Sequence, residues 1–119
     1  MNKVNFLLQH LLYKSVERYP HKTAIVENEK SLRFKELDDK STQLANLLIK
    51  SGIRQKEIVA VIMNKSIEMI ISMIAVLKAG CAYIPIDPHY VPDLRIYKIL
   101  DSSGSNYIIT HRAHWAGLS

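Results

Sequence analysis

The sequence predicts an α/β fold in which a helix and a β-hairpin precede a parallel sheet. Three observations support this prediction. Apolar residues recur at helical spacing in several segments, three short runs in the second half are apolar and rich in β-branched residues, and these runs alternate with helical segments. An order of strand, helix, strand, helix, strand requires two crossover connections, and such crossovers join parallel strands with right-handed geometry.

A helix and a hairpin are expected in the first third of the chain. From Val4 to Tyr19, apolar residues recur at helical spacing, and Pro20 ends the pattern. The next segments, TAIVE and SLRF, are short and β-type, and a polar turn over residues 27–30 separates them. Two such segments around a short polar turn predict an antiparallel hairpin.

A second helix is expected from Phe34 to Lys50. Gly52 follows it at the position where a left-handed C-terminal cap is common. Its predicted apolar face consists of Leu37, Leu44, Leu47 and Leu48, and its predicted polar face contains Asp38, Asp39 and Lys40.

Three strands and two helices then alternate. Each strand is a continuous apolar run, which is typical of strands buried on both faces. The helices carry recognisable end signals: Ser66 as an N-cap, Gly80 after the first helix, Pro92 before the second and Gly104 after it. The expected elements are the strand IVAVIM (Ile58 to Met63), a helix from Ser66 to Lys78, the strand CAYIPI (Cys81 to Ile86), a helix from Asp93 to Ser103, the strand NYIIT (Asn106 to Thr110), and a short amphipathic tail around Trp115.

Length and composition exclude several classes of protein. With 119 residues, 48% of them hydrophobic, the chain is one domain or part of one and is not a disordered segment. The net charge is +5, but basic residues are spread along the chain among acidic ones, so no nucleic-acid partner is expected. No apolar segment reaches the ~20 residues of a membrane span, and the N-terminal run lacks a cleavage site. We expect a cytoplasmic protein with no membrane partner.

No glycine-rich phosphate loop is found in the sequence. The four glycines stand far apart, and Gly52, Gly80 and Gly104 follow predicted helices, so they indicate helix caps. The backbone amides after the first parallel strand, at Asn64-Lys65-Ser66, could receive an anion, but a helix cap is the better interpretation. Asp87, followed by Pro88, is expected to begin a turn in which its carboxylate accepts backbone amides.

Other reactive side chains also have a structural interpretation. His89 could pair with Asp87 as an acid and base, yet no nucleophile stands beside it. The pair His111 and His114 lacks a third metal ligand nearby. The remaining candidates are assigned to a turn (Ser102, Ser103 and Ser105) or to the core (Cys81, Met63, Met69 and Met73). The sequence therefore contains no identifiable catalytic, cofactor-binding or metal-binding residue.

Two motifs resemble those of a known enzyme family. LKAGCAYIPIDPHY, from Leu77 to Tyr90, resembles the second core motif of amino-acid-activating adenylation domains of nonribosomal peptide synthetases, approximately LKAGxAYxPxD. LRFKEL, from Leu32 to Leu37, is similar to their first motif, L-T/S-Y-x-E-L. The flanking segments agree in order along nearly the whole chain. AYIPID favours this branch over the acyl-CoA synthetases and luciferases of the same superfamily of adenylate-forming ligases.

Small departures from the family pattern fall at the start of a helix. Val91 intervenes after the DPxY segment, and Leu94 stands before Arg95 where glutamate is common. In the family, the phosphate loop, the amino-acid pocket, the ribose-binding aspartate and the catalytic lysine all lie downstream of the second motif. The resemblance therefore implies that residues 1–119 are the incomplete N-terminal part of an adenylation domain.

The resemblance leaves two functions open. The first is a segment of an ATP-dependent amino-acid-activating ligase that is inactive alone: no cofactor is expected for this chain, whereas the complete domain uses ATP and Mg²⁺. Its partners would be the remainder of the domain or a complementary chain, and a carrier protein in the complete system. The second is a non-catalytic scaffold protein that pairs with another chain or forms a homodimer. A small nucleotide-binding protein is a third option, weakened by the missing glycine loop.

Overall fold

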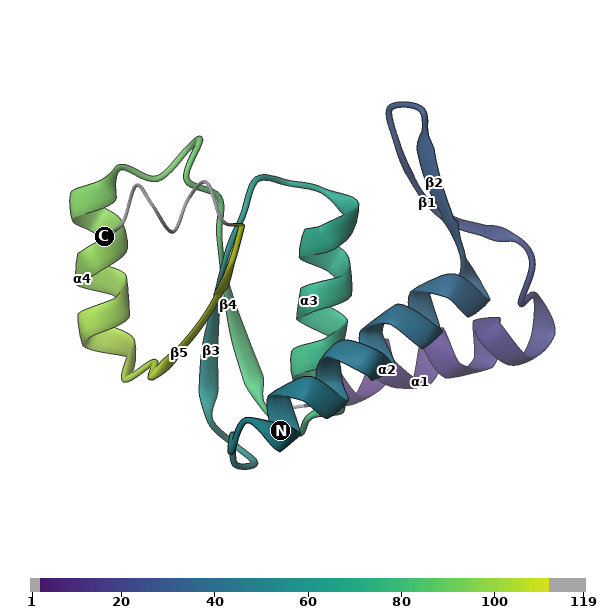
Figure 1. Cartoon of the computed structure of the whole chain (residues 1–119), viewed down its shortest axis with the longest axis horizontal. Coiled ribbons are helices and arrows are strands. Elements are labelled where there is room, and N and C mark those ends of the chain that lie inside the picture. Colours follow the sequence, from purple (N-terminus) through teal and green to yellow (C-terminus); the bar gives the residue numbers. More distant parts are fainter. Residues whose placement is uncertain (1–2, 112–119) are drawn as a thin grey trace.

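The computed structural model describes the backbone of residues 3–111 and the side chains of residues 10–111. Its nine elements follow the predicted order (Figure 1). The helices are α1 (Lys3–Arg18), α2 (Phe34–Lys50), α3 (Ile67–Lys78) and α4 (Asp93–Ser103). The strands are β1 (Thr23–Glu27), β2 (Lys30–Arg33), β3 (Ile58–Ile62), β4 (Ala82–Ile86) and β5 (Tyr107–Thr110). The tail around Trp115 lies outside the described residues.

The second half of the chain builds a three-stranded parallel sheet in the order β4-β3-β5. One helix covers each face: α4 lies on one side of the sheet and α3 on the other (Figure 1). Successive side chains of a strand point to opposite faces. Accordingly, Ala60 and Ile62 pack with Ile96 of α4, whereas Val59 and Val61 pack with Val76 of α3. The predicted parallel α/β fold is confirmed.

The strand order corrects the expected burial of two strands. All three strands were expected to be buried on both faces, but only β3 is central, and four of its five residues are buried. At the edges, β4 buries only Ile86 and exposes Pro85, and Ile108 of β5 is exposed. An edge strand has a neighbour on one side only, so its apolar composition does not guarantee burial.

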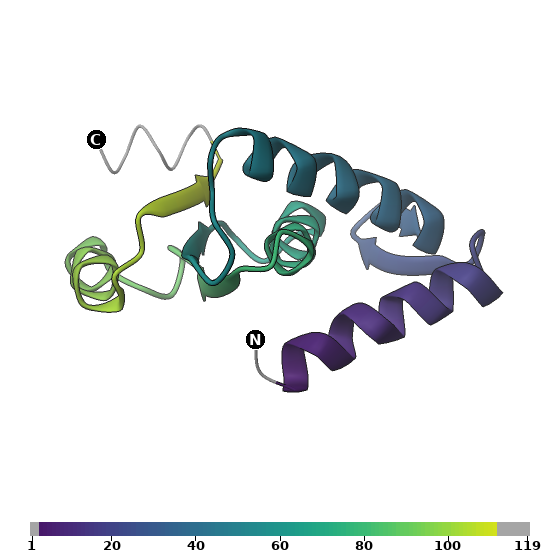
Figure 2. The same cartoon turned by 90° about the horizontal axis from the view of Figure 1, so that it is seen from below.

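Helices α1 and α2 pack around α3 on the side away from the sheet. Figure 2 shows α3 nearly end-on, with α2 passing on one side of it and α1 on the other. The hairpin of β1 and β2 lies beside them as a separate antiparallel sheet. Leu32 and Leu37 pack against Ile67 at the first residue of α3.

The polar and apolar faces of α2 differ from the prediction at two residues. Leu47 was expected on the apolar face but is 63% exposed, and Ala45 and Ser41 are buried instead. Asp38 was expected to face solvent but is half-buried, because it bonds to Lys78 of α3. Small side chains at the contact between α2 and α3 let the two helices approach closely.

Gly80 ends α3 with a left-handed residue, as predicted. Its φ is +80°, its amide donates to the Leu77 carbonyl at 3.0 Å, and the Cys81 amide donates to the Val76 carbonyl at 3.0 Å. These two bonds form a Schellman motif. The chain can therefore leave α3 and enter β4 within three residues.

Gly80→Val is expected to destabilise the protein by about 1–2 kcal/mol, because an L-residue in the left-handed region carries a steric cost of that size. A Cβ atom at this position would also lie 3.0 Å from Cγ of Gln55. The matched control is Gly104→Val, where φ is +71° and nothing lies within 4 Å of the added Cβ. Urea unfolding should show at least as large a loss for Gly80→Val as for the control. A loss below about 0.5 kcal/mol would refute the left-handed requirement.

Candidate functional site

The carboxyl ends of β3 and β4 form the edge at which an α/β sheet usually binds ligands. The chain leaves β3 through residues 63–66 into α3, and leaves β4 through residues 87–92 into α4. Backbone amides in these two loops and at the start of the following helices are the groups that would bind an anion at this edge. The hydrogen bonds of the loops therefore decide whether such a site is present.

In the loop after β3 and the first turn of α3, three backbone amides are bound by side chains of the same protein. The Lys65 amide donates to Oδ2 of Asp87 at 3.2 Å, and the Ile67 amide donates to Oε1 of Glu27 at 3.1 Å. The Met69 amide donates to Oγ of Ser66 at 3.1 Å, which confirms the predicted helix cap. Two carboxylates from distant segments thus stand where an α/β nucleotide-binding protein would place phosphate oxygens.

Asp87 organises the loop after β4 in the same way. Its Oδ1 accepts the His89 amide at 2.9 Å, and its carbonyl oxygen accepts the Tyr90 and Val91 amides at 3.0 Å. The predicted Asp87 turn is confirmed. The His89 ring packs edge-on against Tyr90, with 4.8 Å between the ring centroids. His89 thus takes part in a turn, and the structure gives no contact between its ring and the Asp87 carboxylate.

Asp87→Ala is expected to lower the free energy of unfolding by about 1–2 kcal/mol, because it leaves the Lys65 and His89 amides without a charged acceptor. Asp101→Ala is the matched control. Asp101 is exposed near the C-terminus of α4, where a negative charge is unfavourable, so its removal should be neutral or slightly stabilising. Chemical denaturation of both variants checks this difference. Equal effects for the two variants would show that Asp87 does not hold the loops together.

The other sequence candidates fall into turns or into the core. Ser102 and Ser103 donate to carbonyl groups of α4, and Ser105 Oγ lies 3.0 Å from the carbonyl oxygens of Ile58 and Tyr107. Met63 and Met69 are buried, and Met73 packs against the same cluster. His114 lies outside the described residues. Within residues 3–111, no three His, Cys, Asp or Glu side chains are grouped so that they could hold a metal ion.

Cys81 is buried, as predicted, and lies immediately before β4. It is 2% exposed and packs in the cluster between the sheet and α3. Burial raises the pKa of its thiol above the ordinary value, and the charge of Glu57 raises this pKa further, while a backbone hydrogen bond at Glu57 opposes both effects. A raised pKa lowers the thiolate fraction at neutral pH, and the thiolate is the reactive form.

Cys81 should therefore react with iodoacetamide at pH 7.5 at least about tenfold more slowly in the folded protein than in urea, because both the thiolate fraction and access are reduced. Mass spectrometry of the alkylated protein over time measures the two rates. Rates that are equal in the folded and unfolded states would contradict the buried, protonated thiol.

Sequence reasoning missed two side-chain contacts that fix the position of α3. Glu27 reaches the first amide of α3 from the hairpin, 40 residues away in the chain. At the other end of the helix, Lys78 Nζ lies 2.6 Å from Oδ1 of Asp38 and 2.9 Å from Oγ1 of Thr42. In the sequence, nothing but the polar side chains of these residues indicates the contacts, because the partners lie in other elements.

None of the described helices has the length and hydrophobicity that a bilayer crossing requires.

Comparison with known proteins identifies the family. The family model of the AMP-binding enzymes matches residues 12–118. Bacitracin synthase 2 of Bacillus licheniformis is 40% identical over 105 residues, 88% of this chain and 4% of the relative. Tyrocidine synthase 1 of Brevibacillus parabrevis is 41% identical over 106 residues, 89% of this chain and 10% of the relative. The chain thus spans a small fraction of these relatives.

Solved structures agree on the fold. The N-terminal subdomain of Klebsiella oxytoca NpsA superposes with a TM-score of 0.80 at 24% identity, covering 87% of this chain and 27% of that subdomain. The nonribosomal peptide synthetase FmoA3 superposes with a TM-score of 0.86 at 29% identity, covering 94% of this chain and 12% of FmoA3. The chain belongs to the AMP-binding enzyme family and has the fold of the N-terminal segment of a nonribosomal peptide synthetase adenylation domain.

Proposed function

We propose that this chain is the scaffold segment of an enzyme that activates an amino acid with ATP. In the complete domain, the amino-acid carboxylate would join AMP and release pyrophosphate, and a carrier-protein thiol would then accept the acyl group. Two solved relatives support this reaction class: FmoA3 has been solved with α-methyl-L-serine-AMP bound, and NpsA has been fused artificially to a carrier domain.

The scaffold role is supported by the carboxyl edge of the parallel sheet, where side chains of this chain already accept backbone amides. We call this the closed edge. Asp87, Glu27 and Ser66 already accept the amides of Lys65, Ile67 and Met69. The acceptors at these three amides favour a structural role for this edge, and we assign none of the described residues a step in the reaction. In this proposal, the segment holds the other parts of an adenylation domain in position, and those other parts provide the contacts to ATP.

A chimeric enzyme tests this function. Residues 1–119 would replace the matching segment in the adenylation domain of tyrocidine synthase 1, to which this chain is 41% identical. If the segment is a scaffold, the folded chimera should retain amino-acid-dependent exchange of pyrophosphate into ATP with the amino-acid preference of the host. A chimera that melts cooperatively but shows no exchange would contradict the proposal.

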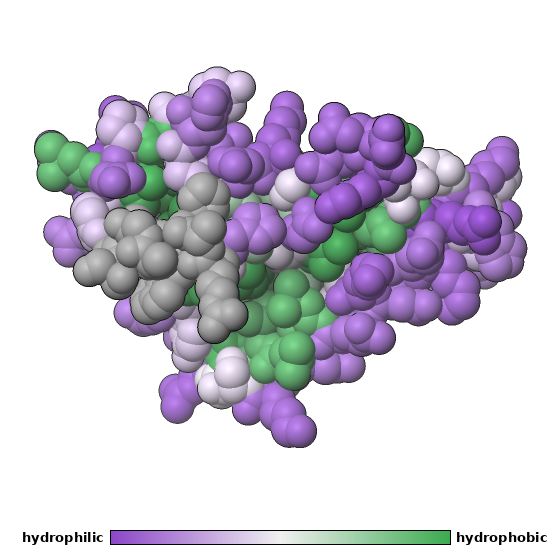
Figure 3. Space-filling model, turned by 45° about the horizontal axis from the view of Figure 1, so that its top comes forward, coloured by the Kyte–Doolittle hydropathy of each residue, from purple (hydrophilic) through white to green (hydrophobic). Residues whose placement is uncertain are grey.

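A non-catalytic interaction protein is the second candidate, favoured by exposed apolar side chains. Hydrophobic residues gather at the centre of the face in Figure 3, between hydrophilic surfaces. Leu47 and Leu94 are 63% and 68% exposed. Apolar patches on a surface promote association. Analytical ultracentrifugation distinguishes this function: a homodimer that is insensitive to salt would favour it, and a monomer at high concentration would exclude self-association.

A further inference from the structure

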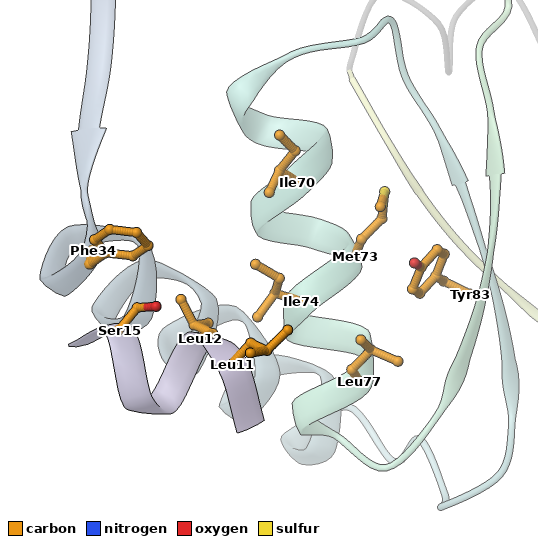
Figure 4. A pocket seen from close by; sticks show the side chains of 9 residues that line it. All are labelled: Leu11, Leu12, Ser15, Phe34, Ile70, Met73, Ile74, Leu77 and Tyr83. Atoms are coloured by element: carbon orange, nitrogen blue, oxygen red, sulfur yellow. The ribbon is translucent and has the colours of Figure 1, made fainter. Parts of the chain in front are cut away.

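An apolar groove runs between α1 and the β4 edge of the sheet, and α3 forms its floor. Its volume is about 280 Å³, and among the described residues that line it, only Ser15 and Tyr83 contribute side-chain oxygen atoms. Figure 4 shows Leu11 and Leu12 of α1 pointing toward Ile74 of α3, with Tyr83 on the side of β4. The other described residues that line the groove are Phe34, Ile70, Met73 and Leu77.

Helix α3 has more apolar surface than this chain covers. Nine of the twelve residues in IEMIISMIAVLK are apolar, and they are distributed around the helix. A helix that is apolar on all sides is typical of a position buried on all sides. Yet Ile70, Met73 and Ile74 are only half-buried, and they line the groove. The sequence of α3 thus fits an environment in which the groove is filled.

The open edge of β4 restricts how the groove can be filled. The Ala82 amide donates to the Glu57 carbonyl, and the Ile86 carbonyl accepts the Met63 amide, so these two residues direct their backbone groups toward β3. Backbone N–H and C=O groups of successive strand residues point to opposite sides of the strand. Those of Tyr83 and Pro85 therefore point away from β3, toward the open edge of the sheet. Proline has no N–H group, and a proline at an edge hinders the addition of a strand. An occupant should therefore contact the groove through apolar side chains.

The comparisons indicate which occupant to expect. The chain covers 27% of the solved NpsA subdomain and has the same fold over that part. The residues of the NpsA subdomain outside the matched part belong to the same folded unit. We therefore expect some of them to pack against the part that corresponds to this chain. The apolar lining excludes a charged ligand, because burying an unpaired charge is costly.

We propose that the groove lined by Leu11, Ile74 and Tyr83 binds an apolar surface of the remainder of an adenylation domain. This inference rests on the proposed function and assigns the surface through which the scaffold acts. It also explains why Leu11, in the middle of α1, is 55% exposed here: the side chain becomes buried when the remainder packs against it.

Leu11→Lys tests the groove in two contexts. In the isolated chain, Leu11 is exposed, so the melting temperature should change by about 3 °C or less. In the tyrocidine synthase 1 chimera, the lysine would be buried among apolar side chains, and the melting temperature should fall by about 5 °C or more. Leu47→Lys is the matched control, because Leu47 is a helical leucine of similar exposure outside the groove. The control should have a small effect in both contexts.

The possible outcomes distinguish an error in the groove assignment from an error in the proposed function. Equal shifts for Leu11→Lys and Leu47→Lys in a chimera that is active would overturn the groove assignment and leave the proposed function intact. A folded but inactive chimera in which Leu11→Lys alone is strongly destabilising would support the groove and overturn the function. A chimera that does not fold would also overturn the groove, since this face would then fail to accept the remainder of a related domain.

Discussion

Amino-acid-dependent exchange of pyrophosphate into ATP should stay at the blank level when the purified 119-residue chain is assayed with ATP, Mg²⁺ and the twenty amino acids. Oriented contacts to phosphate oxygens supply much of the catalysis in phosphoryl-type displacements. In this chain, three amides at the edge where such contacts would form already donate to Asp87, Glu27 and Ser66. Removing a single such contact from an enzyme commonly costs about 10²–10³ in rate, and the scaffold role assigns no such contact to the described residues.

The chimera with tyrocidine synthase 1 is the positive control for this assay. It should show exchange under the same conditions, because the host supplies the phosphate contacts. Exchange by the isolated chain that exceeds the blank, depends on one amino acid and survives repurification would contradict the scaffold role. The Asp87→Ala variant excludes a hidden site at the closed edge: freeing the Lys65 and His89 amides should not create activity.

Ile96→Ala should produce the largest loss of stability among single substitutions in α4, about 2–5 kcal/mol. Ile96 is 0% exposed and is the only buried residue of this helix. It packs against Ala60, Ile62 and Ile86, which form the face of the sheet that α4 covers. Truncation leaves a cavity at the contact that attaches α4 to the sheet. Because small domains are stable by only about 5–15 kcal/mol, this loss is a large share of the total.

Leu94→Ala is the matched control for Ile96→Ala. Leu94 lies in the same helix but is 68% exposed, so its truncation should change stability by about 0.5 kcal/mol or less. Urea denaturation followed by circular dichroism measures both variants. A similar loss for the two variants would show that α4 is not attached to the sheet through Ile96.

Element boundaries were predictable where a residue ends a helix by its own chemistry. Pro92 and Gly104 bound α4, whose observed range agrees with the predicted one, and Ser66 caps α3 as expected. These signals act over one to four residues, so they can be read from the sequence. The parallel direction of the strands was also predictable, because the helices between them require crossovers.

Features that depend on contacts between distant residues were not predictable. Strand order decided which apolar strands are buried, so CAYIPI and NYIIT were wrongly expected to be covered on both faces. The closed edge of the sheet depends on Glu27, which reaches Ile67 across 40 residues, and Leu11 of α1 and Tyr83 of β4 line different sides of one groove. No periodicity or spacing in the sequence indicates these contacts.

The most direct test of the scaffold role is titration of the ¹⁵N-labelled chain with ATP and Mg²⁺, followed by amide NMR. The amides of Lys65, Ile67, Met69 and His89 report on the edge where α/β sheets bind nucleotides, and each already has an acceptor in this protein. If the segment is a scaffold, these four signals should not move in a saturable way. Saturable shifts of these amides on addition of ATP would show that the chain has a nucleotide site of its own and would contradict the scaffold role.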